Sequence, residues 1–271
     1  MAKVLVVTSG KGGVGKTTST AALGAALAQM GQRVVVIDFD VGLRNLDLVL
    51  GAERRVVFDL INVVQGVAKL QQALIRDKRL ENLWLLPASQ TRDKDALTDE
   101  GIGRIIAELR PRFDWILCDS PAGIERGAML AMRYADEAVI VTNPEVSSVR
   151  DSDRIIGMLD SKTVKAERGE CVKKHILIAR YDAGRASRGE MLGIEDILEI
   201  LATPLLGIIP ESQDVLRASN VGSPVTLHNA DSAPARAYVD AVNRLMGETI
   251  AMTVPTERKG FMSRLLGRRA A

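Results

Sequence analysis

Short apolar runs alternate with segments of helical periodicity along most of the 271-residue chain. The first run, at 3–8, precedes a helical pattern at 17–30, and a second run follows at 33–38. Further strand-length runs lie at 83–87, 115–119, 137–142, 175–179 and 205–209, and further helical patterns at 101–109, 125–134, 149–159, 193–201 and 234–247. This alternation predicts an α/β fold whose mostly parallel, twisted sheet is covered by helices on both faces.

The regular pattern ends at Gly247, and a stretch with Thr, Pro255 and mixed polar residues follows it. We therefore expect one domain at 1–247, a linker at 248–257 and a separate short element at 258–271. Charge separates the last element further. Five basic residues and one acid give 257–271 a net charge of +4. Because the whole chain has a net charge of +2, residues 1–256 have a net charge of −2.

Composition narrows the class of protein. The chain is 46% hydrophobic and 26% charged, which is typical of a globular domain. The two cysteines, Cys118 and Cys171, have no metal-ligand spacing and suggest a reducing compartment, with Cys118 as a small buried hydrophobe. The N-terminus has no export-signal pattern, and no apolar run approaches the ~20 residues of a membrane span.

A glycine-rich loop lies between the first predicted strand and the first predicted helix. It matches the P-loop pattern and comprises Gly10, Lys11, Gly12, Gly13, Val14, Gly15, Lys16, Thr17 and Thr18. Glycines let backbone N–H groups approach phosphate oxygens, and the helix N-terminus adds partial positive charge. Lys16 is expected to bridge the β- and γ-phosphates, and the Thr17 hydroxyl to ligate Mg²⁺. The fold class is therefore that of a P-loop NTPase that binds ATP and Mg²⁺.

Two acidic loops follow later strands. Asp38 and Asp40 come after the run at 33–38, and Asp119 ends the run at 115–119. Ligands of α/β folds bind where strands end, so these carboxylates are expected near the phosphate loop. Asp119 is the candidate Walker B residue that holds Mg²⁺ through a water, and Asp38 is a second candidate near the metal. A plain role as turn caps is the alternative for both acids.

Lys11 is an extra lysine that an ordinary P-loop does not require. It is poorly placed to reach its own nucleotide, but it could reach across a dimer interface. The signature at 11–17 resembles the deviant Walker A ATPases, also called the ParA/MinD family. The resemblance implies that Lys11 contacts the partner subunit's nucleotide, that Asp40 orients or activates the attacking water, and that Arg180 and Pro210 border the adenine.

The resemblance covers essentially the whole chain and is most specific at 38–47, 87–95 and 142–153. These stretches look like the branch of the family that places the bacterial division site. The resemblance implies an ATP-bound homodimer on the cytoplasmic face of the inner membrane that recruits the septum inhibitor MinC and is released when MinE stimulates hydrolysis. It places Asn45, Glu53, Glu125, Asp151 and Asp153 on the dimer or partner-binding surface. Asp182 departs from the asparagine of several relatives.

The C-terminal element has the pattern of a basic amphipathic helix. Four apolar residues share one helical face and basic residues flank it: Phe261, Met262, Leu265 and Leu266, with Lys259 and Arg264 among the flanking cations. Such a helix suits the plane of an anionic membrane. A helix docked on the domain's own surface, or a disordered tail, remains the alternative.

Three other functions use parts of the same sequence. A plasmid or chromosome partition ATPase would share the ATP site but bind DNA through surface cations, in a salt-sensitive manner. An electron-transfer protein like the nitrogenase iron protein would need cluster-bridging cysteines, which Cys118 and Cys171 do not resemble. A scaffold with an inactive nucleotide site would show no ATP turnover. We expect the membrane-associated ATPase, with no specific nucleic-acid partner.

Overall fold

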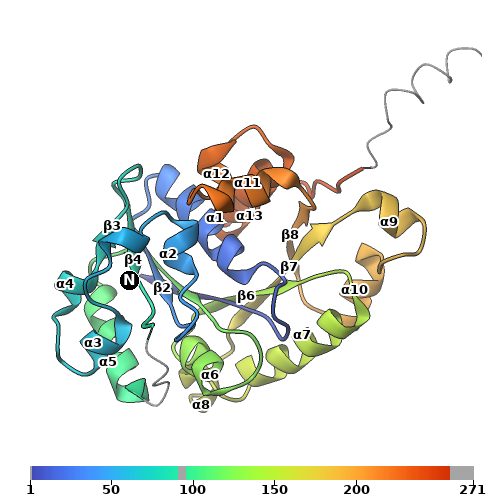
Figure 1. Ribbon diagram of the computed structural model, residues 1–271. Helices are drawn as coiled ribbons and strands as arrows, with labels where there is room; N and C mark the ends of the chain where they lie inside the picture. The colour runs from blue at the N-terminus through green and yellow to red at the C-terminus, as the bar shows by residue number, and fades with distance from the viewer. Residues whose placement is uncertain (1, 91–95, 257–271) are drawn as a thin grey trace, which may run out of the picture.

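A computed structural model describes residues 2–90 and 96–256. Its centre is an eight-stranded sheet in the order β3-β4-β2-β5-β1-β6-β7-β8 (Figure 1). The strands are β1 (Lys3–Thr8), β2 (Val34–Asp38), β3 (Ile75–Arg76), β4 (Leu83–Leu86), β5 (Trp115–Asp119), β6 (Glu137–Thr142), β7 (Lys173–Tyr181) and β8 (Leu205–Pro210). All neighbouring strands are parallel except β3 and β4. The mostly parallel sheet predicted from the sequence is confirmed.

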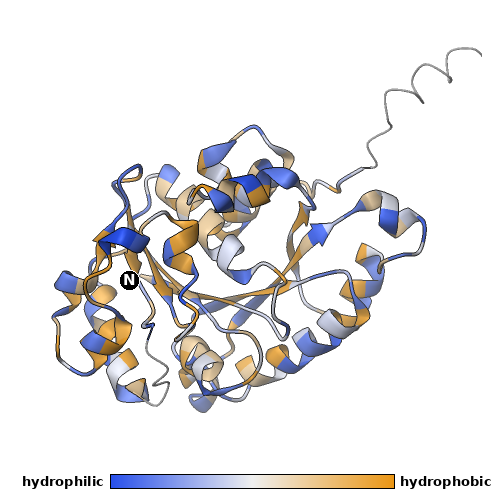
Figure 2. Cartoon of the chain, viewed as in Figure 1, coloured by the Kyte–Doolittle hydropathy of each residue, from blue (hydrophilic) through white to orange (hydrophobic). Residues whose placement is uncertain are grey.

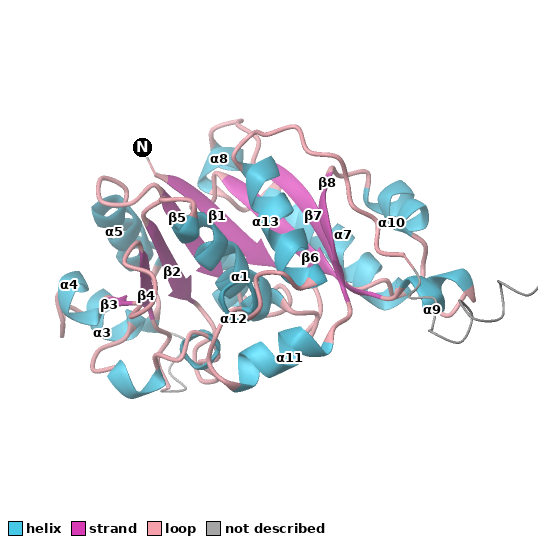
Figure 3. Ribbon diagram, turned by 90° about the horizontal axis from the view of Figure 1, so that it is seen from above, coloured by secondary structure: helices cyan, strands magenta, loops and turns pink. Residues whose placement is uncertain are grey.

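Helices cover both faces of this sheet (Figure 3). One face carries α1 (Lys16–Gln29), α2 (Leu46–Val49), α11 (Gln213–Asn220), α12 (Val225–His228) and α13 (Ala233–Leu245). The other carries α3 (Leu60–Val64), α4 (Leu70–Ala73), α5 (Asp99–Leu109), α6 (Arg126–Met132), α7 (Val146–Leu159) and α10 (Ile194–Leu201). Short elements η1 (Glu53–Arg55), α8 (Val164–Glu167) and α9 (Ala183–Ser187) lie in connections.

The core consists of two apolar layers, one on each side of the sheet. Successive residues of the central strands alternate between the layers: Val4 and Val6 belong to one, and Leu5 and Val7 to the other. All four are fully buried. Figure 2 shows the apolar strands enclosed by helices whose outer faces are hydrophilic. Burial on both faces explains why these strands appear in the sequence as continuous apolar runs.

Several short elements were not predicted from the sequence. β3 is only two residues long and antiparallel, and α2, α4, α8 and α12 have four residues each. Helices this short are not stable in isolation and form because of tertiary packing, so the periodicity of the sequence does not predict them. β7 is also longer than expected, since it spans Lys173–Tyr181 rather than the predicted 175–179.

Cys118 lies buried in β5, as its apolar surroundings predicted, and burial raises the pKa of its thiol to about 12. Cys171 is exposed. No helix among residues 2–90 and 96–256 is long and apolar enough to cross a membrane.

Candidate nucleotide site

The phosphate loop connects the end of β1 to the start of α1, so its backbone lies at the helix N-terminus. Gly13 and Gly15 have φ angles of 75° and 104°, in the left-handed region that favours glycine. Gly10 is needed for a different reason, because a Cβ atom there would lie 2.4 Å from the backbone of Asp151 on α7. The loop therefore requires glycine both for its curvature and for its packing against a distant helix.

Lys16 is the buried cation of this loop, with only 8% of the residue exposed. Its ammonium donates to Ser9 Oγ at 3.0 Å, and Ser9 Oγ in turn donates to the Lys11 carbonyl at 2.7 Å. Burial lowers the pKa of Lys16, and attraction to Asp119 and Asp40 opposes that effect. A buried ammonium within a glycine-rich loop at a helix N-terminus is well suited to phosphate oxygens.

Asp38 and Asp119 lie side by side, because β2 and β5 pair in register there. Asp38 accepts from the backbone N–H groups of Asp40, at 2.8 Å, and Leu46, at 3.1 Å. Asp119 accepts from Thr20 Oγ1 at 2.9 Å and also from the Thr17 hydroxyl. Both carboxylates are thereby held in place at the loop's edge.

Burial is the largest cause of the raised pKa of both acids. Repulsion from Asp119 adds to it at Asp38, while hydrogen bonds from Thr17 and Thr20 oppose it at Asp119, whose pKa rises to about 6. A divalent cation would relieve this repulsion, and carboxylate and hydroxyl oxygens are donors that Mg²⁺ accepts. In the described part of the chain, no group of three His, Cys, Asp or Glu side chains could hold a metal alone. The residues therefore fit a Mg²⁺ ion that also takes ligands from nucleotide phosphates.

The loops after β2 and β5 lie beside the phosphate loop. Asp40 is partly buried and close enough to Lys16 to act on its pKa. The Gly123 N–H donates to the Ser9 carbonyl at 3.1 Å, which joins the loop after β5 to the phosphate loop. All the predicted phosphate and metal residues therefore gather at one edge of the sheet, although their individual roles remain predictions.

Lys11 contacts residues that the sequence analysis did not select. Its ammonium donates to Glu145 Oε2 at 2.7 Å and to Ser147 Oγ at 3.1 Å, both at the start of α7. This pair lowers the pKa of Glu145. Within one chain, the Lys11 side chain is thus paired with residues at the start of α7. This contact depends on the strand order, which brings β6 next to β1.

Arg180 is the penultimate residue of β7 and Pro210 is the last residue of the neighbouring strand β8, and their place beside the adenine stays a prediction. Tyr181 pairs with Pro210 between β7 and β8, and Arg180 Nε donates to Glu211 Oε2 at 2.9 Å. Arg180 has a φ of 58°, an uncommon conformation for a residue other than glycine. Asp182 caps α9 by accepting from the N–H groups of Gly184 and Arg185.

The residues predicted for the partner surface lie beyond the same strand ends. Asn45, Glu125 and Asp153 are exposed, whereas Glu53 and Asp151 are partly buried. Exposed apolar side chains that the sequence analysis missed lie near these residues: Leu43 is 69% exposed, Ile124 52%, and Val146, the first residue of α7, 51%. The predicted membrane residues Lys259, Phe261, Met262, Arg264, Leu265 and Leu266 lie outside the described residues.

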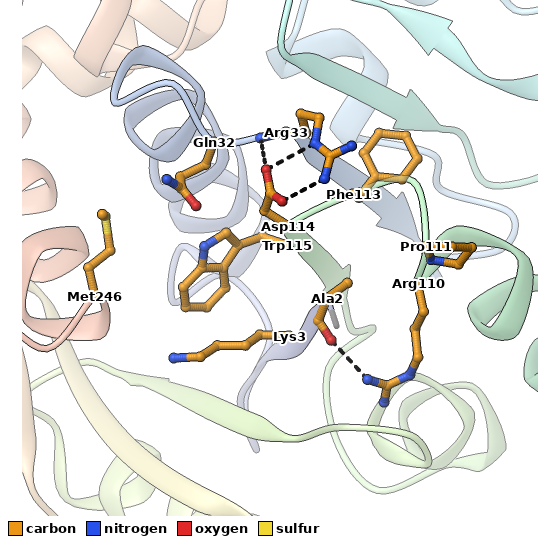
Figure 4. A pocket seen from close by; sticks show the side chains of 10 residues that line it. All are labelled: Ala2, Lys3, Gln32, Arg33, Arg110, Pro111, Phe113, Asp114, Trp115 and Met246. Carbon is orange, nitrogen blue, oxygen red and sulfur yellow. Dashed lines mark hydrogen bonds and ion pairs between the residues drawn. The ribbon is translucent and has the colours of Figure 1, made fainter.

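A hollow of about 520 Å³ lies at the opposite, N-terminal ends of the strands (Figure 4). Lys3, Arg33, Arg110 and Trp115 are among its lining residues. Each of its cations has a carboxylate partner: Lys3 pairs with Glu137, Arg33 with Asp114 and Arg110 with Asp136. Among the described lining residues, every cation is therefore already paired with a carboxylate.

Comparisons with known proteins agree with this site. The family model described as the CobQ/CobB/MinD/ParA nucleotide binding domain matches residues 5–225. The septum site-determining protein MinD of Escherichia coli K12 is 61% identical over 271 residues, which cover 98% of this chain and all of that protein.

Solved structures show the same likeness. MinD in the MinC:MinD complex of Aquifex aeolicus is 43% identical, with a TM-score of 0.84, and the match covers 93% of this chain and 99% of that one. MinD of Pyrococcus horikoshii, solved with Mg-ADP, is 33% identical, with a TM-score of 0.80 and coverage of 91% and 97%. The chain therefore belongs to the CobQ/CobB/MinD/ParA nucleotide-binding family and, within it, to the septum site-determining MinD proteins, ATPases of division-site placement.

Proposed function

We propose that the chain is a Mg²⁺-dependent ATPase that switches between a free state and a membrane-bound dimer to place the division site. The observation that carries this proposal is the meeting of Lys16, Asp38 and Asp119 at the phosphate loop. One buried cation and two buried, adjacent carboxylates suit a phosphate chain with its metal ion. The Pyrococcus relative, whose structure contains Mg-ADP, supports this choice of ligand.

Each residue has a specific task in this proposal. The N–H groups of residues 10–18 and the Lys16 ammonium would hold the phosphate oxygens, and Thr17, Asp119 and Asp38 would hold the metal ion. Asp40 positions or activates the attacking water, because it lies partly buried beside Lys16 at the end of β2. Arg180 and Pro210 border the base. Bound Mg²⁺ supplies neutralisation of the charge that develops on the phosphates.

The proposed homodimer forms through the edge that carries the nucleotide. Lys11 leaves Glu145 and Ser147 and binds the phosphates of the partner subunit. Leu43, Ile124 and Val146 support this assignment, since three exposed apolar side chains border the same edge. Dimer formation therefore depends on bound ATP, because the nucleotide supplies the anion that takes Lys11 from Glu145.

Membrane attachment is proposed for the basic element at 258–271. Each basic residue near an anionic surface contributes roughly 1 kcal/mol, and burial of each apolar side chain roughly 1.5–3 kcal/mol before ordering costs. One tail therefore binds weakly, whereas two tails on one dimer gain about 10²–10⁴ in apparent affinity. ATP-dependent dimerisation thereby controls attachment to the cytoplasmic face of the inner membrane.

MinC is the proposed partner, in keeping with the MinC:MinD complex of the Aquifex relative. Asn45, Glu53, Glu125, Asp151 and Asp153 are the proposed partner-binding or dimer residues, and MinE is the proposed activator of hydrolysis. A partition ATPase is the alternative. The ParA-family ATPase of Chlorobium tepidum is only 20% identical, so its TM-score of 0.73 is evidence for the shared fold alone.

Sedimentation with anionic vesicles tests the switch. The full chain should pellet with ATP and Mg²⁺ but far less with ADP, and both a chain ending at Thr256 and Leu265→Glu should stay in solution. Val254→Glu is the matched control, because Val254 is an exposed apolar residue outside the tail. A full chain that stays in solution with ATP contradicts the proposal, and salt-sensitive DNA binding would then favour a partition ATPase.

A further inference from the structure

The chain does not leave the domain freely where α13 ends. Gly247 takes a left-handed φ of 98°, and the Glu248 N–H donates to the Asn243 carbonyl at 2.9 Å. The Gly247 N–H also donates to the Arg244 carbonyl at 3.1 Å. These two bonds form a Schellman motif, which ends the helix and reverses the chain. Residues 248–252 are thereby directed back toward the sheet.

The Arg244 side chain then holds this returning segment. Its guanidinium donates to the Ile250 carbonyl at 3.2 Å and to the Ala251 carbonyl at 2.7 Å. A third N–H group of the same guanidinium donates to the Leu206 carbonyl of β8 at 2.8 Å. One planar fork therefore ties two carbonyls of the segment to the last strand of the sheet.

Met252 makes the next contact. It is partly buried and packs against the apolar layer on the α7 and α10 side, whereas α13 belongs to the opposite layer. Residues 248–252 must therefore pass around the edge of the sheet at β8. Figure 1 shows the end of the described chain leaving the domain beside this strand. Of the described residues that follow, Thr253, Val254 and Thr256 are exposed and Pro255 is partly buried.

We infer that Arg244 is a positioning residue for membrane attachment: with Met252 it fastens residues 248–252 to the domain, so that the tether to the tail begins only at Thr253. This inference rests on the proposed membrane function of residues 258–271. We call residues 248–252 the strap. When the strap is held on the domain, five residues separate Met252 from Arg258, and when it is released, ten residues separate Gly247 from Arg258. Their extended reach is roughly 17 Å and 34 Å respectively.

Tether length matters because the second tail of a dimer binds the membrane intramolecularly. Effective concentration falls roughly as the −3/2 power of tether length, so doubling the tether should weaken vesicle binding of the ATP-bound dimer about threefold. A single tail gains nothing from a short tether. Binding in ADP should therefore be unaffected.

The experiment compares four full-length variants with the wild type. Arg244→Gln removes the guanidinium, Arg244→Lys keeps the positive charge but loses the three-pronged contact, and Met252→Ser weakens the apolar contact. Arg236→Gln is the matched control, because Arg236 lies on the same helix and donates to the Asp231 carbonyl instead. Thermal unfolding confirms that each variant folds. If the Arg244 variants do not fold, Met252→Ser tests the same inference.

Two measurements are made on each protein. Cleavage by a glutamate-specific protease after Glu248 reports release of the strap, with cleavage after Glu170, in an exposed loop, as the internal reference. Vesicle sedimentation in ATP and ADP reports the effect on attachment. We expect Arg244→Gln, Arg244→Lys and Met252→Ser to be cleaved several-fold faster and to bind vesicles about threefold more weakly in ATP, while Arg236→Gln matches the wild type.

Each other outcome overturns the inference. Unchanged cleavage in the Arg244 variants means that Arg244 does not hold the segment. Faster cleavage with unchanged vesicle affinity means that the strap does not set the tether. Weaker binding by Arg244→Gln but not by Arg244→Lys identifies a charge effect on the lipid. A wild type that does not sediment in ATP defeats the membrane proposal itself, and the tether inference with it.

Discussion

Asp38 and Asp119 lie opposite each other at the carboxyl ends of neighbouring parallel strands, and 1% or less of either residue is exposed. Burial is the largest cause of the raised pKa of each carboxyl group, and repulsion from Asp119 raises the pKa of Asp38 further. Lys16 supplies one neutralising charge, and a divalent cation would supply the rest. The pair is thus a local strain that ligand binding relieves.

Mg²⁺ dependence should change when this pair is broken. Asp38→Asn removes one negative charge but keeps an oxygen that can accept from Asp40 or Leu46. We expect the Mg²⁺ concentration needed for half-maximal ATP binding to rise roughly tenfold, since about 1.4 kcal/mol of attraction would be lost. Titration of a fluorescent ATP analogue with Mg²⁺ measures this.

Asp47→Asn is the matched control for that titration. Asp47 is also fully buried, but it pairs with Arg44 at 2.7 Å on α2. The control should lower thermal stability and leave Mg²⁺ dependence unchanged. Equal Mg²⁺ dependence in Asp38→Asn and the wild type would remove Asp38 from the metal's surroundings. In the wild type, chelation of Mg²⁺ should weaken ATP binding.

Asp40 should matter for turnover more than for binding. Positioned acid–base groups contribute typically about 10²–10⁴ in rate, so Asp40→Asn should lower ATP turnover roughly a hundredfold or more. ATP affinity should change little, because the carboxylate does not bind phosphate. Steady-state hydrolysis and equilibrium binding on the same preparation separate the two effects, and full turnover in the variant would exclude the assigned role.

Gly10 should not tolerate even a methyl group. In Gly10→Ala the new Cβ would lie 2.4 Å from the Asp151 backbone, so the loop or α7 must move. We expect ATP affinity to fall at least tenfold and the unfolding temperature to drop. Gly157→Ala, on the same helix α7 but with no atom near its Cβ, should instead stabilise the fold by roughly 0.5–1 kcal/mol. Similar effects of both substitutions would contradict the packing argument.

Glu137 should make stability depend on pH in acid. Burial alone would raise its pKa, but hydrogen bonds from His175 and Lys3 and attraction to Lys3 and Lys173 prevail and lower it to about 2. Because the unfolded carboxyl titrates near 4.5, the stabilisation is complete above about pH 5 and is lost as the pH falls toward 2. Glu137 thus stabilises the native state at neutral pH.

Glu137→Gln tests this dependence. The variant should be less stable than the wild type by roughly 1–3 kcal/mol at pH 7, and the difference should vanish toward pH 2. Denaturant unfolding at a series of pH values measures it. A difference that stays constant across this range would mean that the carboxylate charge is not the source of the stability.

The sequence by itself determined the site's chemistry and the class of the fold. The backbone conformation of the phosphate loop is a local property, so the glycines at 10–15 predict it directly from the sequence. Buried parallel strands must be apolar on both faces, so continuous apolar runs such as 34–38 and 115–119 also predict strands of this kind. Asp38 and Asp119 could be placed at the phosphate loop because parallel strands end at one edge.

Only the tertiary structure decided which distant residues meet. Lys11 contacts Glu145 and Ser147, which lie more than 130 residues further along the chain. These residues come close to Lys11 because β6 lies next to β1. The alternation of strands and helices does not specify strand order, because every order buries the same apolar faces. The contact of Arg244 with residues 250–251 likewise arises from a chain reversal whose return path is set by packing at the sheet's edge.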